Sequence, residues 1–172
     1  GLSRVGRRSF GGFTYAQAAL VIDELTRAVE IMVKDRIGAI IVIEREADLS
    51  ELAESGVRVD ARVNHSVLVH LFTPRGPLHD GAVLIQRGRI SSASLVLPLT
   101  QSQNLGRAYG TRHRAGVGLT EEVDALVVIV SEERGGISLA ENGQLRPDLS
   151  VQALRKALHE KLGTPAKASA SK

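Results

Sequence analysis

Two uninterrupted apolar runs dominate the hydrophobic pattern of the chain. Residues 39–43 and 125–130 consist almost entirely of Val, Ile, Leu and Ala. A strand covered on both faces of a sheet presents apolar side chains in both directions, so its sequence is continuously apolar rather than alternating. The two runs therefore predict the central strands of a sheet that has other layers packed on both sides.

Apolar positions at helical spacing, bounded by capping residues, predict four helices. Thr14 and Gln17 have the spacing of a capping box, in which a hydroxyl and an amide each satisfy a backbone N–H. Asp48 and Glu51 have the same spacing, and Asn64 and Ser150 precede two further amphipathic stretches. The predicted helices cover residues 15–36, 48–56, 64–72 and 150–162.

The remaining strands are predicted from alternation and turn signals. Residues 57–63 alternate apolar with charged side chains, which is typical of an exposed strand. Arg87-Gly88 and Asn142-Gly143 are tight-turn pairs, each flanked by strand-like segments. The flanking segments are residues 82–86 with 89–97, and 137–140 with 144–146. Strands and helices alternate in this way in an α/β domain with a mixed central sheet flanked by helices.

Length and composition favour a single domain. The chain has 172 residues, 43% of them apolar, and no cysteine, which excludes disulfides and thiolate metal sites. Residues 1–13 are rich in Gly, Arg and Ser and are expected to form a flexible lead-in. Residues 163–172 are too polar to pack and are expected to form a disordered tail. Residues 14–162 are therefore expected to form the domain.

The charge balance points to no particular partner. A net charge of +3 suits an anionic ligand but is more typical of a soluble surface. Aromatic residues make up only 3% of the chain, which leaves little material for stacking nucleic-acid bases. No nucleic-acid partner is expected, and no apolar run is long enough to cross a bilayer.

A turn at residues 110–114 has the composition of a phosphate site. Gly110 allows close backbone approach, and Thr111 is placed to cap a following helix whose first N–H groups attract anions. Arg112 and Arg114 add guanidinium groups on either side of His113. Residues two apart on a helix point to different sides, so the two arginines are not expected to grip one phosphate. A basic surface turn is the alternative.

Two acidic turns are candidates for the rest of a site whose phosphates are bound at residues 110–114. His79 and Asp80, before Gly81, could hold a hard divalent cation or deprotonate a hydroxyl. Glu132 and Glu133 follow a buried strand, where open α/β sheets commonly place ligand sites. Each has an alternative: an Asp-Gly turn entering a strand, and a solvated hairpin.

Together these turns resemble the motifs of the diadenylate cyclase (DAC) domain. The matching segments are His79-Asp80-Gly81-Ala82, Gly110-Thr111-Arg112-His113-Arg114 and Ser131-Glu132-Glu133. The stretch from Arg36-Ile37-Gly38-Ala39 onward is similar to the CdaA-type, membrane-anchored members. The resemblance covers about residues 14–162. It implies condensation of two ATP molecules to cyclic di-AMP, with release of two pyrophosphates, by 3′-hydroxyl attack on the α-phosphate across two subunits that face each other.

The resemblance implies a role for each matching residue. Asp80 would be the essential catalytic carboxylate and would hold the metal with His79. Arg112, His113 and Arg114 would act in catalysis and bind phosphate. The other ATP-binding positions would be Gly81, Ala82, Leu97 through its main chain at the adenine edge, Gly110, Thr111, Ser131, Glu132 and Glu133. One departure is Val96, where CdaA-type members often carry an aromatic residue.

The resemblance also implies a cellular setting. The expected cofactor is a divalent metal, Mn²⁺, Mg²⁺ or Co²⁺, and a homodimer is needed for catalysis. The catalytic domain would be cytoplasmic, anchored to the cell membrane through helices that precede Gly1 in the natural protein. The alternative function is a non-catalytic nucleotide-binding or sensor module that uses the same phosphate turns.

Overall fold

A computed structural model describes residues 9–10 and 13–163. Seven strands form one mixed sheet in the order β4-β6-β5-β3-β7-β8-β9. Only β3 and β5 pair in parallel, and every other neighbouring pair is antiparallel. The elements in chain order are β1 (Ser9–Phe10), β2 (Phe13–Thr14), α1 (Tyr15–Lys34), β3 (Ala39–Glu44), α2 (Ser50–Glu54), β4 (Val57–Arg62), α3 (His65–Phe72), β5 (Ala82–Gln86), β6 (Arg89–Leu95), α4 (Thr111–Glu122), β7 (Ala125–Val130), β8 (Ile137–Glu141), β9 (Gln144–Leu149) and α5 (Val151–Lys161).

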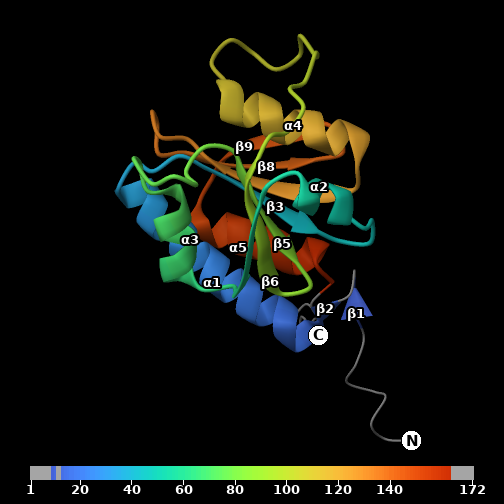
Figure 1. Ribbon diagram of the computed structural model, residues 1–172. Coiled ribbons are helices and arrows are strands. Elements are labelled where there is room, and N and C mark those ends of the chain that lie inside the picture. The colour runs from blue at the N-terminus through green and yellow to red at the C-terminus, as the bar shows by residue number, and fades with distance from the viewer. Residues whose placement is uncertain (1–8, 11–12, 164–172) are drawn as a thin grey trace, which may run out of the picture.

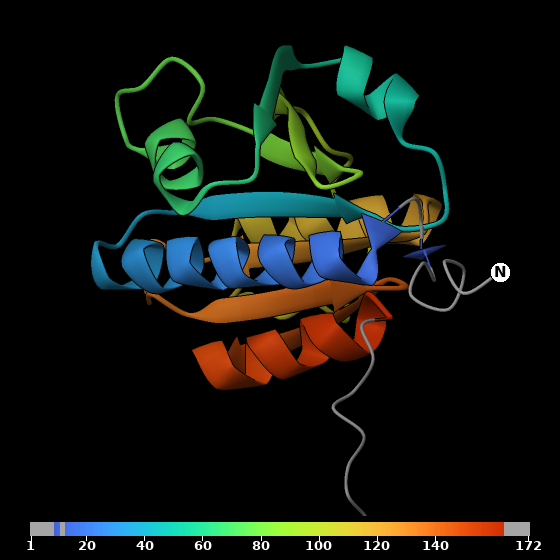
Figure 2. The same cartoon turned by 90° about the horizontal axis from the view of Figure 1, so that it is seen from below.

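Helices cover both faces of the sheet. Side chains of α1, α3 and α5 pack with one face of the central strands into a single apolar cluster. Side chains of α2 and α4 pack on the other face in a second cluster. Figure 1 shows α4 on the opposite side of the strands from α1 and α5, and Figure 2 shows α1 and α5 lying along the sheet. The predicted fold class, a mixed sheet flanked by helices, is confirmed.

The central strand β3 is paired along its whole length. It runs antiparallel to β7, with Ala39 opposite Val130 and Glu44 opposite Ala125. On its other side it runs parallel to β5, with Ile41 opposite Val83. Both β3 and β7 are buried at every residue, as their continuous apolar sequences predicted. The start of β3 therefore lies beside the start of β5 and the end of β7.

The helix caps agree with the sequence at three ends and differ at two. Thr14 and Gln17 form the predicted capping box, and the side chains of Asn64 and Ser150 accept N–H bonds as predicted. The predicted Asp48–Glu51 capping pair is wrong, because Leu49 is the N-cap and Asp48 accepts instead from the Ser50 N–H at 3.0 Å. Helix α1 ends two residues earlier than predicted.

Residues 9–10 and 13–14, which belong to the end of the predicted lead-in and the start of the domain, form two short strands. Ser9–Phe10 pairs antiparallel with Phe13–Thr14 in a two-stranded ribbon directly before α1. The tail predicted to be disordered lies, after Gly163, outside the described residues. The described part of the lead-in is thus tied back on itself through backbone hydrogen bonds.

Both outer strands of the sheet are interrupted. Strand β4 shifts its register against β6 between Arg58 and Ala61 and has Asp60 at a φ of 49°. Strand β9 contains Pro147, which has no N–H to donate, and a register shift against β8. These features are typical of edge strands.

Helix α4 is held against the segment that follows β6 by an unusually close backbone approach. A Cβ added at Gly118 would lie 2.0 Å from the Pro98 carbonyl oxygen and 2.7 Å from the Thr100 nitrogen. The Thr100 N–H also donates to the Arg114 carbonyl at 3.0 Å. Glycine at position 118 therefore sets the distance between α4 and residues 98–100.

We expect Gly118→Ala to lower the free energy of unfolding by about 2 kcal/mol or more, because backbone atoms cannot yield to the added methyl group. Urea unfolding measures this. Gly106→Ala is the matched control, since nothing lies within 4 Å of a Cβ at that position, and its effect should stay within about 0.5 kcal/mol. Equal stability of the two variants would contradict the close-approach argument.

Candidate active site

A cleft of about 630 Å³ opens at the edge of the sheet where β3 and β5 begin and β7 ends. Most of its lining comes from four segments far apart in the sequence: the turn before β5, the segment after β6, the start of α4 and the turn after β7. Ten of the predicted site residues are among its walls: Asp80, Gly81, Leu97, Gly110, Thr111, Arg112, His113, Ser131, Glu132 and Glu133. The structure thus brings the three predicted turns to one place.

The first turn of α4 faces this cleft. Gly110 is the N-cap, and no side chain caps the helix, so the expected cap by Thr111 is wrong. Thr111 is instead the first helical residue, and both residues line the cleft. Backbone N–H groups at an uncapped helix start carry partial positive charge, which suits an anionic ligand.

Arg112, which lines the cleft, lies close to the backbone of Gly38, just before β3. A Cβ added at Gly38 would lie 2.3 Å from the Arg112 Cζ atom, so only glycine leaves room for the guanidinium. Arg112 Nη1 also lies 3.4 Å from Glu132 Oε1. Within the described residues, the ion-pair partner of Arg112 is this half-exposed carboxylate, which an anionic ligand can displace.

Arg114 points away from the cleft. Its Nη2 donates to the carbonyl oxygens of Leu105 and Gly106, at 3.4 Å and 3.3 Å. The two arginines therefore lie on different sides of α4, as the helical spacing predicted. Arg114 supports the loop before the helix here, and its role in binding phosphate stays a prediction.

His113 is buried behind the mouth of the cleft. Burial lowers the pKa of His113 below its ordinary value of 6.5, and the charges of Arg112 and Arg134 lower it further against an opposing effect of Asp148. The ring of Tyr109 lies with its centroid 5.0 Å from that of His113. A neutral imidazole can hydrogen-bond a ligand but adds no positive charge at neutral pH.

His79 and Asp80 form a pair that suits a hard cation. His79 Nδ1 lies 2.6 Å from the Gly76 carbonyl oxygen, which only accepts, so Nδ1 carries the proton. His79 Nε2 then faces Asp80 Oδ1 at 3.3 Å. In the neutral imidazole both of these atoms are acceptors, and such a pair needs a shared proton or cation between them.

The protein supplies few ligands beyond this pair. Among the described residues, no group of three or more His, Cys, Asp or Glu side chains is placed to hold a metal ion. Mg²⁺ bound with a nucleotide is usually held by one or two carboxylates together with phosphate oxygens and water. Asp80 supplies such a carboxylate, with the imidazole of His79 beside it.

Gly81 and Ala82 both pack against strand β6. Gly81 has a φ of 88°, and a Cβ there would lie 2.5 Å from the Leu95 carbonyl oxygen. Ala82 pairs with Leu95 and is fully buried, outside the cleft lining. The glycine is needed because the turn presses against β6, which aims Asp80 into the solvent at the mouth of the cleft.

Several lining residues were missed by the sequence analysis: Tyr109, Arg134, Ser138 and Asp148. Tyr109 could have been found as the aromatic residue directly before the glycine of the phosphate turn. Asp148 belongs to β9, and its φ of 57° falls at the irregular part of the β8–β9 pairing. No sequence pattern indicates that this acid reaches the cleft.

Comparison with known proteins identifies the family. The family model described as DAC, DisA bacterial checkpoint controller nucleotide-binding, matches residues 26–145, more than half of the chain. The chain belongs to this family. The DAC chain is 43% identical over 137 residues to the cyclic di-AMP synthase CdaA of Bacillus subtilis, which covers 80% of the chain and 50% of the relative. It is 40% identical over 144 residues to a diadenylate cyclase of Listeria monocytogenes, which covers 84% of the chain and 53% of the relative.

Solved structures agree with the fold. A double mutant of DacA from Staphylococcus aureus superimposes with a TM-score of 0.80 at 43% identity, over 83% of the DAC chain and 95% of the other. A hypothetical membrane-spanning protein from Bacillus cereus gives a TM-score of 0.71 at 41% identity, over 74% and 63% of the two chains. The DAC chain spans about half the length of the curated relatives named above. Within residues 9–10 and 13–163, no helix has the length and apolar character to cross a membrane.

The lowered pKa of His113 predicts how stability depends on pH. Above a pH of about 6.5, this histidine is neutral in both the folded and the unfolded chain. Below that value the unfolded chain takes up the proton first, so stability is lost as the pH falls through the folded pKa. We expect the free energy of unfolding to drop between about pH 7.5 and about pH 5.5, and His113→Gln to reduce that drop.

Urea unfolding at the two pH values measures this. His159 has a pKa lowered by burial and by Arg155, so His159→Gln should reduce the drop separately. The carboxyl group of Glu24, whose pKa is also lowered, titrates below this window. An unchanged pH dependence in His113→Gln would show that the buried imidazole does not resist protonation.

Proposed function

We propose that this DAC domain is a diadenylate cyclase, which condenses two ATP molecules into cyclic di-AMP and releases two pyrophosphates. The observation that carries the proposal is the meeting, in one cleft of a DAC family member, of the Asp80 carboxylate with the arginine-bearing start of α4. The names of the relatives support it, since they are called cyclic di-AMP synthase and diadenylate cyclase. The reaction needs cationic groups and N–H donors at the phosphates of the nucleotide. It also needs an acidic side chain near the attacking hydroxyl or the metal ion.

The triphosphate is assigned to the start of α4. The uncapped N–H groups after Gly110 and the guanidinium of Arg112 supply donors and positive charge in the same part of the cleft. Phosphoryl-type transfer depends mainly on positioning and on stabilising the developing charge. Thr111 and the neutral His113 add hydrogen-bonding groups, and Ser131, Glu132 and Glu133 line the side where phosphate and metal meet. The adenine edge is assigned to the main chain of Leu97.

The reaction follows from a second nucleotide placed opposite the first. The 3′-hydroxyl oxygen of one ATP forms a bond to the α-phosphorus of the other, and the bond from that phosphorus to the bridging oxygen of the β-phosphate breaks. The hydroxyl proton leaves to Asp80 or to water near it, and pyrophosphate carries away the electron pair. A second, equivalent displacement closes the ring.

His79 and Asp80 are the side chains that would hold a divalent cation, Mn²⁺, Mg²⁺ or Co²⁺. Such an ion supplies charge neutralisation at the phosphates and polarisation of the attacking hydroxyl. The fixed proton on His79 Nδ1 leaves Nε2 available as a ligand. Gly81 keeps Asp80 at the mouth of the cleft, where the metal ion or the attacking hydroxyl would lie.

The cleft surface supports a face-to-face homodimer. The Asp80 side chain is 91% exposed, and Val96 and Leu99 at the same cleft are 86% and 49% exposed. A carboxylate that stays in the solvent lies at the rim of its own subunit's cleft, where a second subunit can approach it. The valine offers less stacking area to adenine than the aromatic residue common in CdaA-type members, which affects binding strength and leaves the reaction unchanged.

A membrane setting is proposed for the longer protein. The B. subtilis relative is about twice as long as the matched region, and the B. cereus structure is described as that of a membrane-spanning protein. We assign the catalytic domain to the cytoplasm and the anchor to a segment outside these residues. Cell fractionation of the natural full-length protein tests this assignment.

We expect the protein to form cyclic di-AMP from ATP with Mn²⁺ or Mg²⁺, and Asp80→Asn to lower the rate at least about 100-fold. The substitution removes a proton acceptor and a metal ligand but little packing, because the side chain is exposed. Chromatographic product analysis measures the rate. Asp60→Asn is the matched control and should keep full activity, since Asp60 is an exposed aspartate on β4 that pairs with Arg89 of β6.

Nucleotide binding without product, in a sample shown to dimerise, would favour the alternative of a non-catalytic sensor module. Full activity in Asp80→Asn would remove the role assigned to that carboxylate.

We expect the rate per molecule to rise with protein concentration until the dimer is saturated, because each half-reaction needs a nucleotide on the opposite subunit. ATP binding should show no such dependence, since one cleft holds one nucleotide. Initial rates over a dilution series, compared with equilibrium ATP binding in the same samples, test this. A rate per molecule that stays constant well below the measured dimer dissociation constant would exclude the two-subunit mechanism.

A further inference from the structure

The segment that joins α1 to β3 contacts both charged walls of the cleft, the 131–136 turn through Arg36 and Arg112 through Gly38. We propose that Arg36 is a positioning residue that fixes the acidic turn at residues 131–136, so that Glu132 and Glu133 face Arg112 across the cleft. The inference rests on the proposed function for its effect on catalysis. The positioning itself depends only on contacts within the chain.

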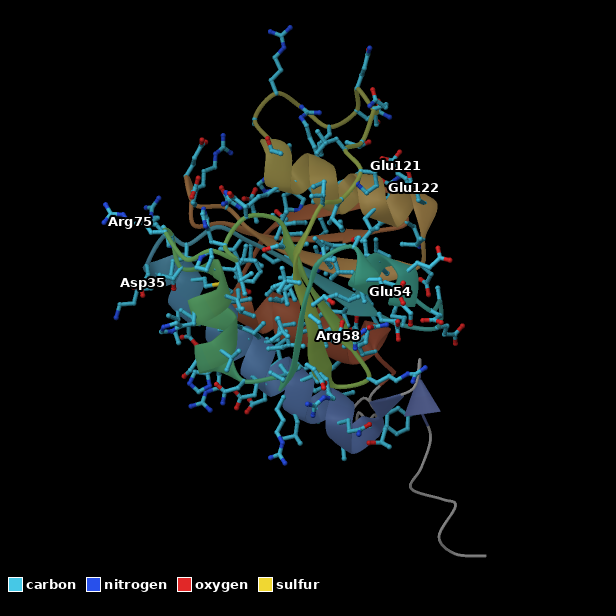
Figure 3. The ribbon with its side chains drawn as sticks, viewed as in Figure 1. Asp35, Glu54, Arg58, Arg75, Glu121 and Glu122 are labelled. Carbon is cyan, nitrogen blue, oxygen red and sulfur yellow. The ribbon has the colours of Figure 1, made fainter. Side chains whose placement is uncertain are left out.

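The backbone at Arg36 is unusual for its residue type. Its φ is 56°, in the left-handed region that favours glycine, and this turn ends α1 one residue after its C-cap, Asp35, labelled in Figure 3. A side chain held in this conformation is unfavourable unless its surroundings stabilise it. The conformation ends the helix, so the arginine does not continue along the α1 axis.

The guanidinium reaches the tip of the acidic turn. Arg36 Nη1 donates to the Glu133 carbonyl oxygen at 2.7 Å, across 97 positions of sequence. Gly135 is packed against the same place, since a Cβ there would lie 3.2 Å from the Val33 carbonyl oxygen and 3.7 Å from Arg36 Cδ. The turn therefore rests on the end of α1 through one side-chain bond and one glycine contact.

The turn is closed on itself but carries exposed acids. The Ser131 N–H donates to the Gly136 carbonyl at 2.9 Å, and the Gly135 N–H donates to the Ser131 carbonyl at 2.8 Å. These bonds set the shape of the turn, and the bond from Arg36 holds its tip against the end of α1. Without that bond the turn would open to solvent more often, which would transiently break these two bonds and displace both glutamates.

The same segment also positions the opposite wall. Gly38, two residues after Arg36, is the residue across which the Arg112 guanidinium lies. Arg112 and Glu132 approach to 3.4 Å, so a displaced Glu132 would change the charge beside the reacting phosphate. A shift of about 1 Å in a positioning contact can lower a rate by up to about 100-fold.

Arg36→Gly tests the proposal because glycine accepts the left-handed backbone and removes only the guanidinium. Arg87→Gly is the matched control: Arg87 is an exposed arginine with a φ of 49° in the turn between β5 and β6. We expect the Ser131 and Gly135 amides to exchange with deuterium at least about 10-fold faster in Arg36→Gly than in the parent, without nucleotide present. Arg87→Gly should exchange there as the parent does, and urea unfolding should show both variants folded.

In the activity assay, Arg36→Gly should lower kcat by roughly 10-fold and change the KM for ATP by less than about threefold, since the α4 start that binds the triphosphate is untouched. Arg36→Lys should recover part of kcat, because an ammonium can still donate to the Glu133 carbonyl. Unchanged amide exchange in Arg36→Gly would overturn the positioning role, whether or not cyclic di-AMP is formed. Faster exchange with an unchanged kcat would overturn its importance for catalysis. A parent that forms no product would reject the proposed function, while the exchange result would still decide the positioning role.

Discussion

The arrangement of the cleft depends on the two-sided pairing of β3. Its antiparallel register with β7 places the residues before Ala39 beside those after Val130, and its parallel pairing with β5 brings the Asp80 turn to the same edge. A shift of the register by one residue would turn every side chain of this strand to the opposite face, where the packing of side-chain sizes in both apolar clusters would be lost. The hydrogen-bonded pairing of this buried strand therefore determines which polar turns lie next to one another.

Two glycines allow the helix that carries the arginines, α4, to lie close to the rest of the domain. Gly118 lets α4 lie against residues 98–100, and Gly38 lets the Arg112 guanidinium lie close to the backbone. Helix α4 and the guanidinium that it carries therefore each lie directly against main chain. Preorganised donors of this kind stabilise charge without having to reorient when it develops.

The sequence was informative where pattern and burial coincide. The apolar runs of β3 and β7 predicted the centre of the sheet, and the Thr14, Asn64 and Ser150 caps predicted three helix starts. The resemblance to the DAC family predicted that the acidic and basic turns form one site. Long-range geometry was not predictable: Asp148 enters the cleft through an irregular strand pairing, and Arg36 leaves its helix for a turn 97 positions away. The opposite directions of Arg112 and Arg114 followed from helical spacing, but the carbonyl groups that hold Arg114 lie in a loop without a recognisable pattern.

The interrupted outer strands limit how copies of this domain can associate. Pro147 leaves β9 without one donor, and the shifted register around Asp60 bends β4, so neither border offers a regular ladder of free backbone groups. Continuation of the sheet from one molecule into another is thereby disfavoured. Any contact between copies then has to use side-chain surfaces. A domain whose sheet borders are interrupted in this way carries little risk of growing into an extended β-aggregate.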